Sequence, residues 1–229
     1  MGKFFSYFLT LAFLTNLAFA QENDELQPLT LSNKHQIGIR LGTWVNSGEK
    51  PPLLLVDTID NTSLATSVKD ASFYFEGYFA YSLIPHTYVE LSLGLVNRGS
   101  VTLQENNNTD IGNLLLYPIL LQLKLYPIGS FNSKFQPYVT IGGGLYYGKR
   151  NVQFTNNRFS FFKFNEDTET DFNYTLSGGA DWLLNNSLAL DFNIKYMPIN
   201  FSKSLVTISD YDAVAITVGI KYLYAKNKK

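Results

Sequence analysis

Along most of the chain, apolar residues recur at every second position, which is the period of a β-strand with two unlike faces. Eight such runs follow a polar lead that ends near Lys34, and each has the roughly 9 to 11 residues, or slightly more, that a tilted strand needs to cross a bilayer. The runs are His35 to Asn46, Asp70 to Leu83, Thr87 to Asn97, Gly112 to Tyr126, Phe135 to Gly148, Asp171 to Leu184, Ser187 to Pro198 and Asp212 to Tyr224. They predict an all-β chain.

The connections between these runs alternate in length. They are short at 84–86, 127–134 and 185–186, and long and rich in Asn, Asp, Ser and Thr near 47–69, 98–111, 149–170 and 199–211. Long and short connections must therefore lie at opposite ends of the sheet, as in transmembrane barrels with short periplasmic turns and long external loops. We expect an eight-stranded antiparallel up-and-down transmembrane β-barrel with both termini on the periplasmic side.

The two faces of the predicted strands differ in composition. One face carries about forty apolar residues, among them Ile37, Leu91 and Leu121, and no charge. The other face carries Gly, Ser and Ala together with charged residues whose formal charges cancel. An eight-stranded barrel is only wide enough for its own side chains to fill it, so the larger apolar face must point outward, toward lipid.

Aromatic residues mark both ends of the apolar face. Phe73 and Phe172 lie near the ends that carry long loops, Trp182 and Tyr222 lie near the short turns, and mid-strand positions favour Leu, Ile and Val. Aromatic residues are common in strands generally, but two bands of them are typical of the girdles at membrane–water interfaces. The distribution therefore favours a strand that spans a membrane.

The first residues have the features of a secretory signal peptide. Lys3 supplies a positive region, an apolar core follows, and Ala18-Phe19-Ala20 is a small-x-small cleavage site. An uncleaved anchor helix fits less well because the core is short, and N-myristoylation at Gly2 fits less well because an export segment follows at once. The sequence predicts a signal peptide at 1–20 and an outer-membrane β-barrel domain at 21–229.

Composition narrows the possible functions. The 229 residues carry 18 basic and 19 acidic side chains, a net charge of −1, so no basic surface exists to concentrate nucleic acid. The chain has no Cys and therefore no disulfides to form after export. We expect a protein of the outer membrane of a Gram-negative type of cell, with membrane lipid as a partner and no nucleic acid.

Several segments resemble the OmpW family of small outer-membrane channels and the broader group of outer-membrane β-barrel domains. Residues 116–125 are similar to that family's Pro-containing strand, 136–145 to its RPYVGAG-type strand, and 178–182 and 190–196 to its GVDY and LD-x-x-x-x-Y elements. The final run, Thr217-x-Gly219-x-x-Tyr222-x-Tyr224, is similar to a C-terminal assembly signal, although five residues follow it here. The resemblance implies insertion by the barrel-assembly machinery through the last strand.

The resemblance also implies a narrow channel for small hydrophobic solutes, and the inward-facing residues divide into two sets. Toward the external end, a mainly apolar set predicts a solute vestibule: Trp44, Tyr74, Val96, Leu116, Pro118, Leu120, Tyr146 and Met197. Toward the periplasmic end, a charged set predicts an ion-pair network: Arg40, Glu76, Glu90, Lys124, Asp181, Asp191, Lys195 and Lys221. Opposite charges in a narrow lumen must pair to offset desolvation, so we expect a closed plug rather than an open water pore. A filled, inert barrel is the alternative that eight strands also permit.

Catalysis is not expected. The two His residues, His35 and His86, fall on the periplasmic side, whereas a barrel enzyme acting on lipid A needs a base near the external membrane edge. A Ser such as Ser72 or Ser177 therefore lacks an activating base. Two His are too few for a metal site of usual ligand count, and Gly142-Gly143-Gly144 has no following helix that would make it a phosphate loop. We expect no metal and no cofactor.

Two other functions are compatible with eight up-and-down strands. A soluble lipocalin-like carrier would place the large apolar face inside, which exceeds the volume of the lumen. The long connections, with Asn106-Asn107-Asn108 and aromatic residues such as Phe159 and Phe161, would suit binding of a host surface or another protein. A structural or adhesive barrel without transport is therefore the alternative to a channel.

Overall fold

The computed structural model describes residues 31, 33–48, 55–56, 63–104, 108–128, 134–152, 167–205 and 208–225. All regular secondary structure in these ranges is β-strand. In the same ranges, no helix is long and apolar enough to span a membrane. The predicted signal peptide at 1–20 and the loop residues Asn106, Asn107, Phe159 and Phe161 lie outside the described residues.

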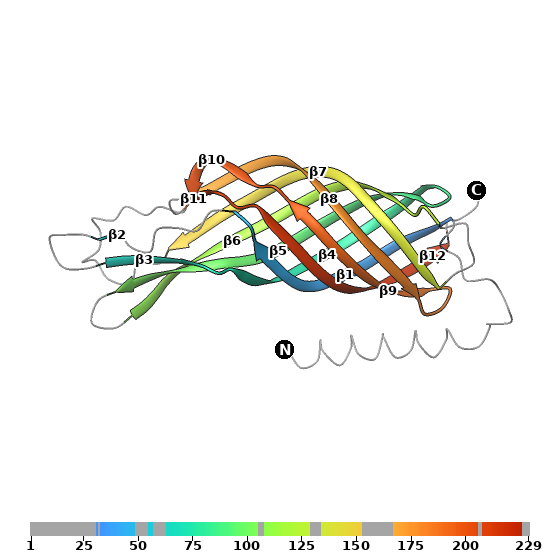
Figure 1. Ribbon diagram of the computed structural model, residues 1–229, viewed down its shortest axis with the longest axis horizontal. Coiled ribbons are helices and arrows are strands. Elements are labelled where there is room, and N and C mark those ends of the chain that lie inside the picture. The colour runs from blue at the N-terminus through green and yellow to red at the C-terminus, as the bar shows by residue number, and fades with distance from the viewer. Residues whose placement is uncertain are drawn as a thin grey trace, which may run out of the picture.

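Eight long strands form the body of the structure, and each overlaps one of the predicted runs. They are β1 (Lys34–Asn46), β4 (Ala71–Ile84), β5 (Thr87–Gln104), β6 (Asn108–Leu125), β7 (Phe135–Val152), β8 (Asp167–Leu183), β9 (Leu188–Met197) and β12 (Ala213–Ala225). Each pairs antiparallel with its neighbour among the eight, and β1 also pairs with β12, which closes the sheet. The predicted eight-stranded antiparallel barrel is confirmed (Figure 1).

Closure has a defined register. Leu41 of β1 lies opposite Val218 of β12 on one side and opposite Phe75 of β4 on the other. All three residues are exposed on the outside of the barrel, because residues directly opposite in a ladder share a face. A register shift of one residue would send this apolar set into the lumen, so the outer face itself fixes the pairing.

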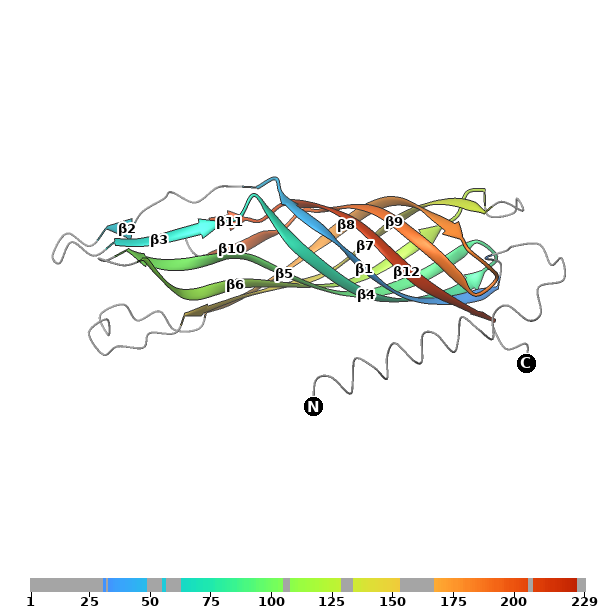
Figure 2. The ribbon, with the colours of Figure 1, turned by 90° about the horizontal axis from the view of Figure 1, so that it is seen from below.

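The two ends of the barrel differ in the way the sequence predicts. At the short-turn end, β4 joins β5 through residues 85–86, and β8 joins β9 through 184–187. At the long-loop end, β5, β6, β7 and β8 continue beyond the predicted runs, and the short strands β2 (Leu55–Val56) and β3 (Ser63–Val68) extend the sheet along β5. Figure 2 shows these strand ends projecting past the barrel body.

The prediction that the long connections are loops was wrong for parts of them, which form β-strands. Residues 63–68 pair with 99–104, and β10 (Asn200–Leu205) forms a hairpin with β11 (Ile208–Asp210). Their sequences are polar and irregular in period, so they carry no strand pattern of their own. They are strands because the neighbouring strand offers unpaired backbone groups beyond the predicted span, which only the assembled sheet provides.

The orientation of the two faces agrees with the volume argument. Leu121 is 58% exposed and Ile141 is 57% exposed, whereas the neighbouring inward residues Leu120 and Gln122 are 1% and 2% exposed. Aromatic residues border the outer apolar belt at both ends, with Phe73 and Phe172 toward the long loops and Trp182 toward the short turns. The larger apolar face of the strands therefore points outward, and a soluble lipocalin-like arrangement is incompatible with the structure.

Candidate functional site: the filled lumen

The interior of the barrel is divided into three layers along its axis. An apolar and aromatic layer lies at the long-loop end, an ionic layer lies in the middle, and a second aromatic layer lies at the short-turn end. We call them the long-loop layer, the ionic layer and the short-turn layer. The sequence predicted the first two, whereas the third was not recognised.

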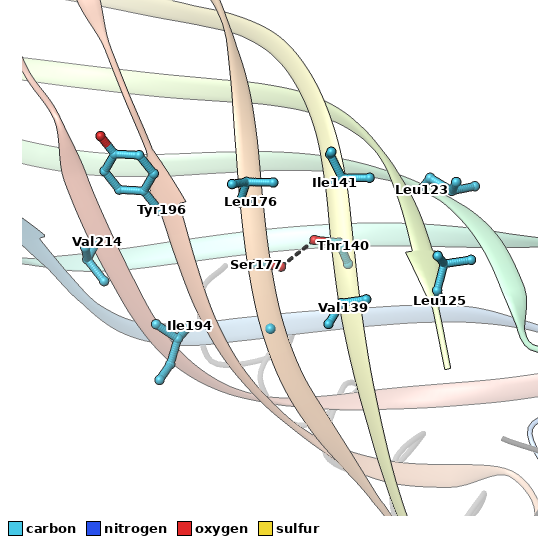
Figure 3. A pocket seen from close by; sticks show the side chains of 11 residues that line it. Leu123, Leu125, Val139, Thr140, Ile141, Leu176, Ser177, Ile194, Tyr196 and Val214 are labelled. Atoms are coloured by element: carbon cyan, nitrogen blue, oxygen red, sulfur yellow. Dashed lines mark hydrogen bonds between the residues drawn. The ribbon is translucent and has the colours of Figure 1, made fainter. Parts of the chain in front are cut away.

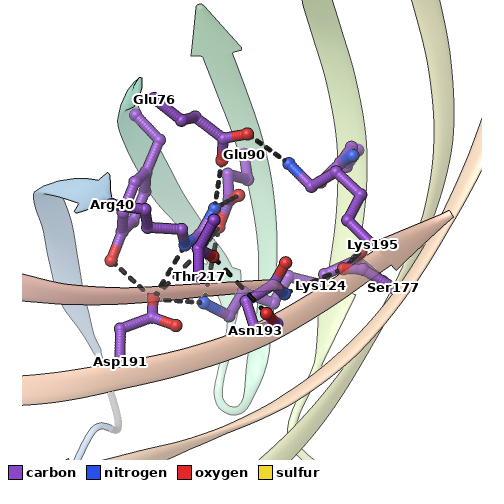
Figure 4. A network of polar contacts seen from close by, with 12 residues as sticks. Arg40, Glu76, Glu90, Lys124, Ser177, Asp191, Asn193, Lys195 and Thr217 are labelled. Atoms are coloured by element: carbon purple, nitrogen blue, oxygen red, sulfur yellow. Dashed lines mark hydrogen bonds and ion pairs between the residues drawn. The ribbon is translucent and has the colours of Figure 1, made fainter. Parts of the chain in front are cut away.

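Arg40 is the centre of the ionic layer. Its Nη1 lies 2.5 Å from Glu76 Oε1 and 2.7 Å from Glu90 Oε1, and its Nη2 lies 3.0 Å from Asp191 Oδ2. The guanidinium group therefore contacts carboxylates from three different strands, as Figure 4 shows. The planar group has five donors in a fixed arrangement, so one side chain can hold several carboxylates in a space from which water is excluded.

Three lysines complete the charge balance. Lys195 Nζ lies 2.6 Å from Glu76 Oε2, and Lys124 Nζ lies 3.4 Å from Glu90 Oε2. Lys221 forms an ion pair with Asp181, and its Nζ also lies 3.6 Å from Asp191 Oδ2. All eight predicted network residues are at most 1% exposed, so the structure brings the whole set together.

Lys221 offsets the repulsion between two neighbouring carboxylates. Asp181 of β8 lies directly opposite Asp191 of β9 in the ladder. Like charges in directly opposed positions destabilise a strand pair. Because Lys221 reaches both carboxylates from β12, it offsets the repulsion and makes the pairing of β8 with β9 compatible with two buried acids.

Tyrosines that the sequence pattern did not assign to the network donate further hydrogen bonds to its carboxylates. The hydroxyl groups of Tyr78 and Tyr138 donate hydrogen bonds to Asp191 at 2.7 and 2.6 Å, and Tyr126 donates one to Asp181 at 2.6 Å. Tyr74, predicted as a vestibule residue, donates to Glu76 at 2.6 Å and so joins the long-loop layer to the ionic layer. Alternation alone placed these rings inside, but their partners depend on strand register.

Two glycines make room for these rings. A Cβ atom on Gly38 would lie 2.7 Å from the Tyr78 hydroxyl oxygen, and one on Gly179 would lie 2.6 Å from the Tyr138 hydroxyl oxygen. Each glycine is the cross-strand partner of the tyrosine in question. Because these two glycines have no side chain, the tyrosine ring on the neighbouring strand lies over the glycine backbone inside the lumen.

The long-loop layer contains the predicted vestibule residues. Seven of them belong to one buried cluster, and Pro118 is also buried, directly opposite Tyr146. The cluster comprises Trp44, Tyr74, Val96, Leu114, Leu116, Leu120, Tyr146, Met197, Ile199, Phe201, Tyr211, Ala213 and Ala215. The side chains of this layer are packed against one another, so a solute would bind by displacing them.

The short-turn layer closes the opposite end. Leu31, just before β1, is fully buried in a cluster with Tyr88, Tyr126 and Tyr138. The Tyr88 hydroxyl donates a hydrogen bond of 2.5 Å to the Leu31 carbonyl oxygen. Leu31 thus covers the short-turn end of the lumen, which the polar character of residues 21–34 did not indicate.

A groove of about 540 Å³ lies on the outside of the barrel, away from the predicted lumen residues. Its lining includes the exposed residues Val139, Ile141, Leu176 and Ile194, as Figure 3 shows, together with Gly178. Gly178 faces outward without a side chain, so it leaves a depression in the apolar belt. In a membrane protein, this surface is in contact with lipid chains.

His35 and Ser177, two of the residues considered as catalytic groups, have structural contacts. The His35 ring stacks on Tyr81 with 4.6 Å between ring centroids, and its Nδ1 accepts a hydrogen bond from the Ser82 amide. Ser177 hydrogen-bonds Thr140 at 2.5 Å. Among the described residues, no three His, Cys, Asp or Glu side chains are grouped as metal ligands.

A closed barrel of eight antiparallel strands, with an apolar outer belt and a charged interior, defines a transmembrane β-barrel of the outer-membrane class. The sequence matches the family described as outer membrane protein beta-barrel domain over residues 26–223, and the chain belongs to that family. This confirms the resemblance to small outer-membrane barrels that the strand motifs indicated.

Two solved structures show the same fold. The outer membrane protein OprG from Pseudomonas aeruginosa has 20% identity and a TM-score of 0.59, with 86% of this chain and 100% of that chain covered. Neisserial surface protein A has 11% identity and a TM-score of 0.52, with 83% and 97% covered. A search of curated proteins finds no match. The protein is therefore an outer-membrane β-barrel.

Proposed function

We propose that this protein takes up small hydrophobic solutes into the long-loop layer and does not form an open water pore. The observation that carries the proposal is the separation of the lumen into an apolar layer and an ionic layer. In outer-membrane barrels the long loops face the exterior, so the apolar layer is the part that external solutes reach first. Its aromatic and aliphatic side chains match an apolar solute, whereas they offer few groups to a polar one.

The ionic and short-turn layers support the second half of the proposal. Eight buried charges with a formal sum of zero fill the middle of the lumen, and Leu31 with Tyr88 covers the end beyond them. An ion crossing this region would have to break pairs that are shielded from water, which is costly. A solute in the long-loop layer is therefore blocked from moving on toward the short-turn end by the ionic layer and the short-turn layer.

Uptake of an apolar dye by whole cells tests the proposal. Cells that produce the protein should accumulate N-phenylnaphthylamine severalfold faster than cells without it, because the long-loop layer offers an apolar path past the polar outer surface. Met197→Arg and Trp44→Arg should abolish the increase, since each places a charge in the layer. Ser202→Arg, at an exposed position of β10, is the matched control and should leave uptake unchanged.

Folding must be checked in the same samples. Folded barrels and boiled barrels migrate differently on detergent gels, so the mobility shift reports whether each variant is assembled. Val96→Trp fills the long-loop layer without adding a charge, and it should also reduce dye uptake. Equal uptake by the wild-type protein and a folded Val96→Trp variant would overturn the proposal.

Binding of a surface or protein partner is the second candidate. The observation that favours it is the extension of the sheet past the barrel, where β3 pairs with residues 99–104 of β5, and β5 continues in pairing with β6 (Figure 2). Ordered strands outside a membrane offer a rigid surface to a partner. Deleting residues 151–170 should reduce adhesion to host matrix if this function exists, whereas dye uptake should stay at the wild-type rate.

The proposal includes export to the outer membrane through the signal peptide at 1–20. Mass spectrometry of the purified protein should find Gln21 as the first residue, because cleavage is expected after Ala20.

A further inference from the structure

Arg98 is a buried cation within the long-loop layer, and neither its position nor its role was predicted from the sequence. Its side chain is 0% exposed. The guanidinium carbon lies 5.7 Å from the centre of the Trp44 ring and 5.8 Å from that of Tyr211. Both rings belong to the long-loop layer, so Arg98 points into the lumen among apolar and aromatic neighbours.

Arg98 continues the inward alternation of β5, two residues after the buried Val96, and it lies at a β-bulge. The pairing of β5 with β6 passes from Asn97 opposite Leu115 to Gly99 opposite Leu114, which leaves Arg98 without a partner in the β6 ladder. The Asn97 side-chain oxygen accepts a hydrogen bond of 3.2 Å from the Gly99 amide and bridges the irregularity. Bulges interrupt regular pairing and often occur next to functional sites.

Within the described part of the chain, the Arg98 side chain makes no hydrogen bond. None of its three guanidinium nitrogens has a hydrogen-bond partner there, and no ion pair joins it to a described carboxylate. An arginine stays protonated in proteins, so it cannot escape the cost of burial by losing its charge. Aromatic faces attract a cation, but this attraction is weaker than the hydration that burial removes. Arg98 therefore lacks an anion.

Trp44 contributes a second donor to the same region. Its indole nitrogen Nε1 is buried and has no hydrogen-bond partner among the residues that the structure describes. An indole N–H and a guanidinium group only donate hydrogen bonds, so a ligand that satisfies both must be an acceptor. The side chains beyond them, such as Met197, Ile199 and Leu116, offer no such acceptor and bind only an apolar body.

We propose that Arg98 and Trp44 bind the carboxylate of a small amphipathic acid whose apolar part lies in the long-loop layer. A carboxylate presents two oxygens in the plane of the guanidinium group, so it forms paired, charge-assisted hydrogen bonds with Arg98. Met197 is long, flexible and unbranched, so its movement makes room for the apolar body. This inference rests on the proposed uptake of hydrophobic solutes and names the chemical class of the preferred solute.

Quenching of Trp44 fluorescence tests the proposal in lipid nanodiscs. The chain has two tryptophans, and Trp182 is lipid-facing, so the Trp182→Phe background makes Trp44 the sole reporter. The probes are ω-bromooctanoate and the uncharged ω-bromooctanol, whose bromine quenches indole on contact. We expect octanoate to bind about tenfold or more tightly than octanol, the factor that one charge-assisted hydrogen bond supplies.

Substitutions separate the charge from the apolar layer. Arg98→Gln should remove the preference for octanoate and leave octanol binding unchanged, and Arg98→Lys should keep part of the preference. Lys203→Gln removes a positive charge from the exposed surface of β10 and should change neither affinity. Comparing variants in the same nanodiscs cancels the different partitioning of the two probes into lipid.

The outcomes distinguish this inference from the proposed function. Equal binding of both probes to wild type, with no change in Arg98→Gln, overturns the carboxylate site and leaves apolar uptake standing. Binding of neither probe, together with no dye uptake, overturns both. A fall in the unfolding midpoint of Arg98→Gln as large as that of Arg40→Gln would show that Arg98 has a structural partner within the chain, and it would also overturn the site.

Discussion

Arg40 and Arg98 are equally buried in the same lumen, yet their surroundings are opposite. Arg40 contacts Glu76, Glu90 and Asp191, whereas Arg98 faces the rings of Trp44 and Tyr211 and has no carboxylate among the described residues. A paired cation in a low-dielectric space stabilises the fold only together with its partners. An unpaired buried cation such as Arg98 lowers the stability of the fold, so its presence is better explained by ligand binding than by stabilisation.

The ionic layer and the long-loop layer also differ in how easily a single side chain can be displaced. In the ionic layer, Arg40 and Glu76 each have charged partners on more than one other strand, so moving one side chain disturbs the others. In the long-loop layer, the aliphatic side chains such as Met197 and Leu116 make apolar contacts that are individually weak. Solute binding is therefore expected where side chains can be displaced singly.

The largest effect expected is that of Arg40→Met. Removing the guanidinium group leaves Glu76, Glu90 and Asp191 buried with fewer cations, which should lower the free energy of unfolding by about 3–5 kcal/mol. Urea unfolding of the protein in lipid vesicles, followed by tryptophan fluorescence, measures the change. Lys203→Met on the exposed face of β10 is the control. An unchanged midpoint for Arg40→Met would remove the distinction between the two arginines.

A third environment for arginine sharpens the comparison. Leu121 of β6 is 58% exposed between Ile119 and Leu123 on the apolar outer belt, so Leu121→Arg should place a charge in hydrocarbon and cost about 2–4 kcal/mol. Thr43→Arg, on the same face but near the long-loop end of β1, should cost about 0–1 kcal/mol because the side chain reaches the interface. The same urea experiment compares them. Equal costs at both positions would contradict the assignment of the outer belt to lipid.

The smallest effect is expected for Arg98→Met. Since no partner is lost and an unpaired charge is replaced by an apolar side chain of similar length, stability should change by less than about 1 kcal/mol or increase. The unfolding midpoint, measured beside that of Arg40→Met, gives the contrast directly. A loss of several kcal/mol would mean that Arg98 contributes to the fold in the way that Arg40 does.

Much of this structure follows from local sequence pattern. Strict alternation identified the eight strands and assigned Leu121 to the outside and Lys124 to the inside, because successive side chains of a strand point to opposite faces. The limited volume of an eight-stranded lumen then decided which face is enclosed. The neutral sum of the inner charges was enough to predict a closed ionic network.

What the pattern could not supply are relations between distant strands. Arg40 and Asp191 are 151 residues apart, and their contact depends on the register of β1, β12 and β9 together. The tyrosines that bind Asp191, the strand β3 on the flank of β5, and the bulge beside Arg98 have the same origin. Each requires the assembled sheet, because hydrogen-bond register is set between strands.

The amino-acid sequence by itself therefore determined which side of every barrel strand meets lipid, since a period of two residues is a local property of the backbone. The tertiary structure alone decided which enclosed charges meet and which one is left without a partner. That outcome depends on how eight strands align around a closed ring, because the partners of each enclosed side chain come from other strands.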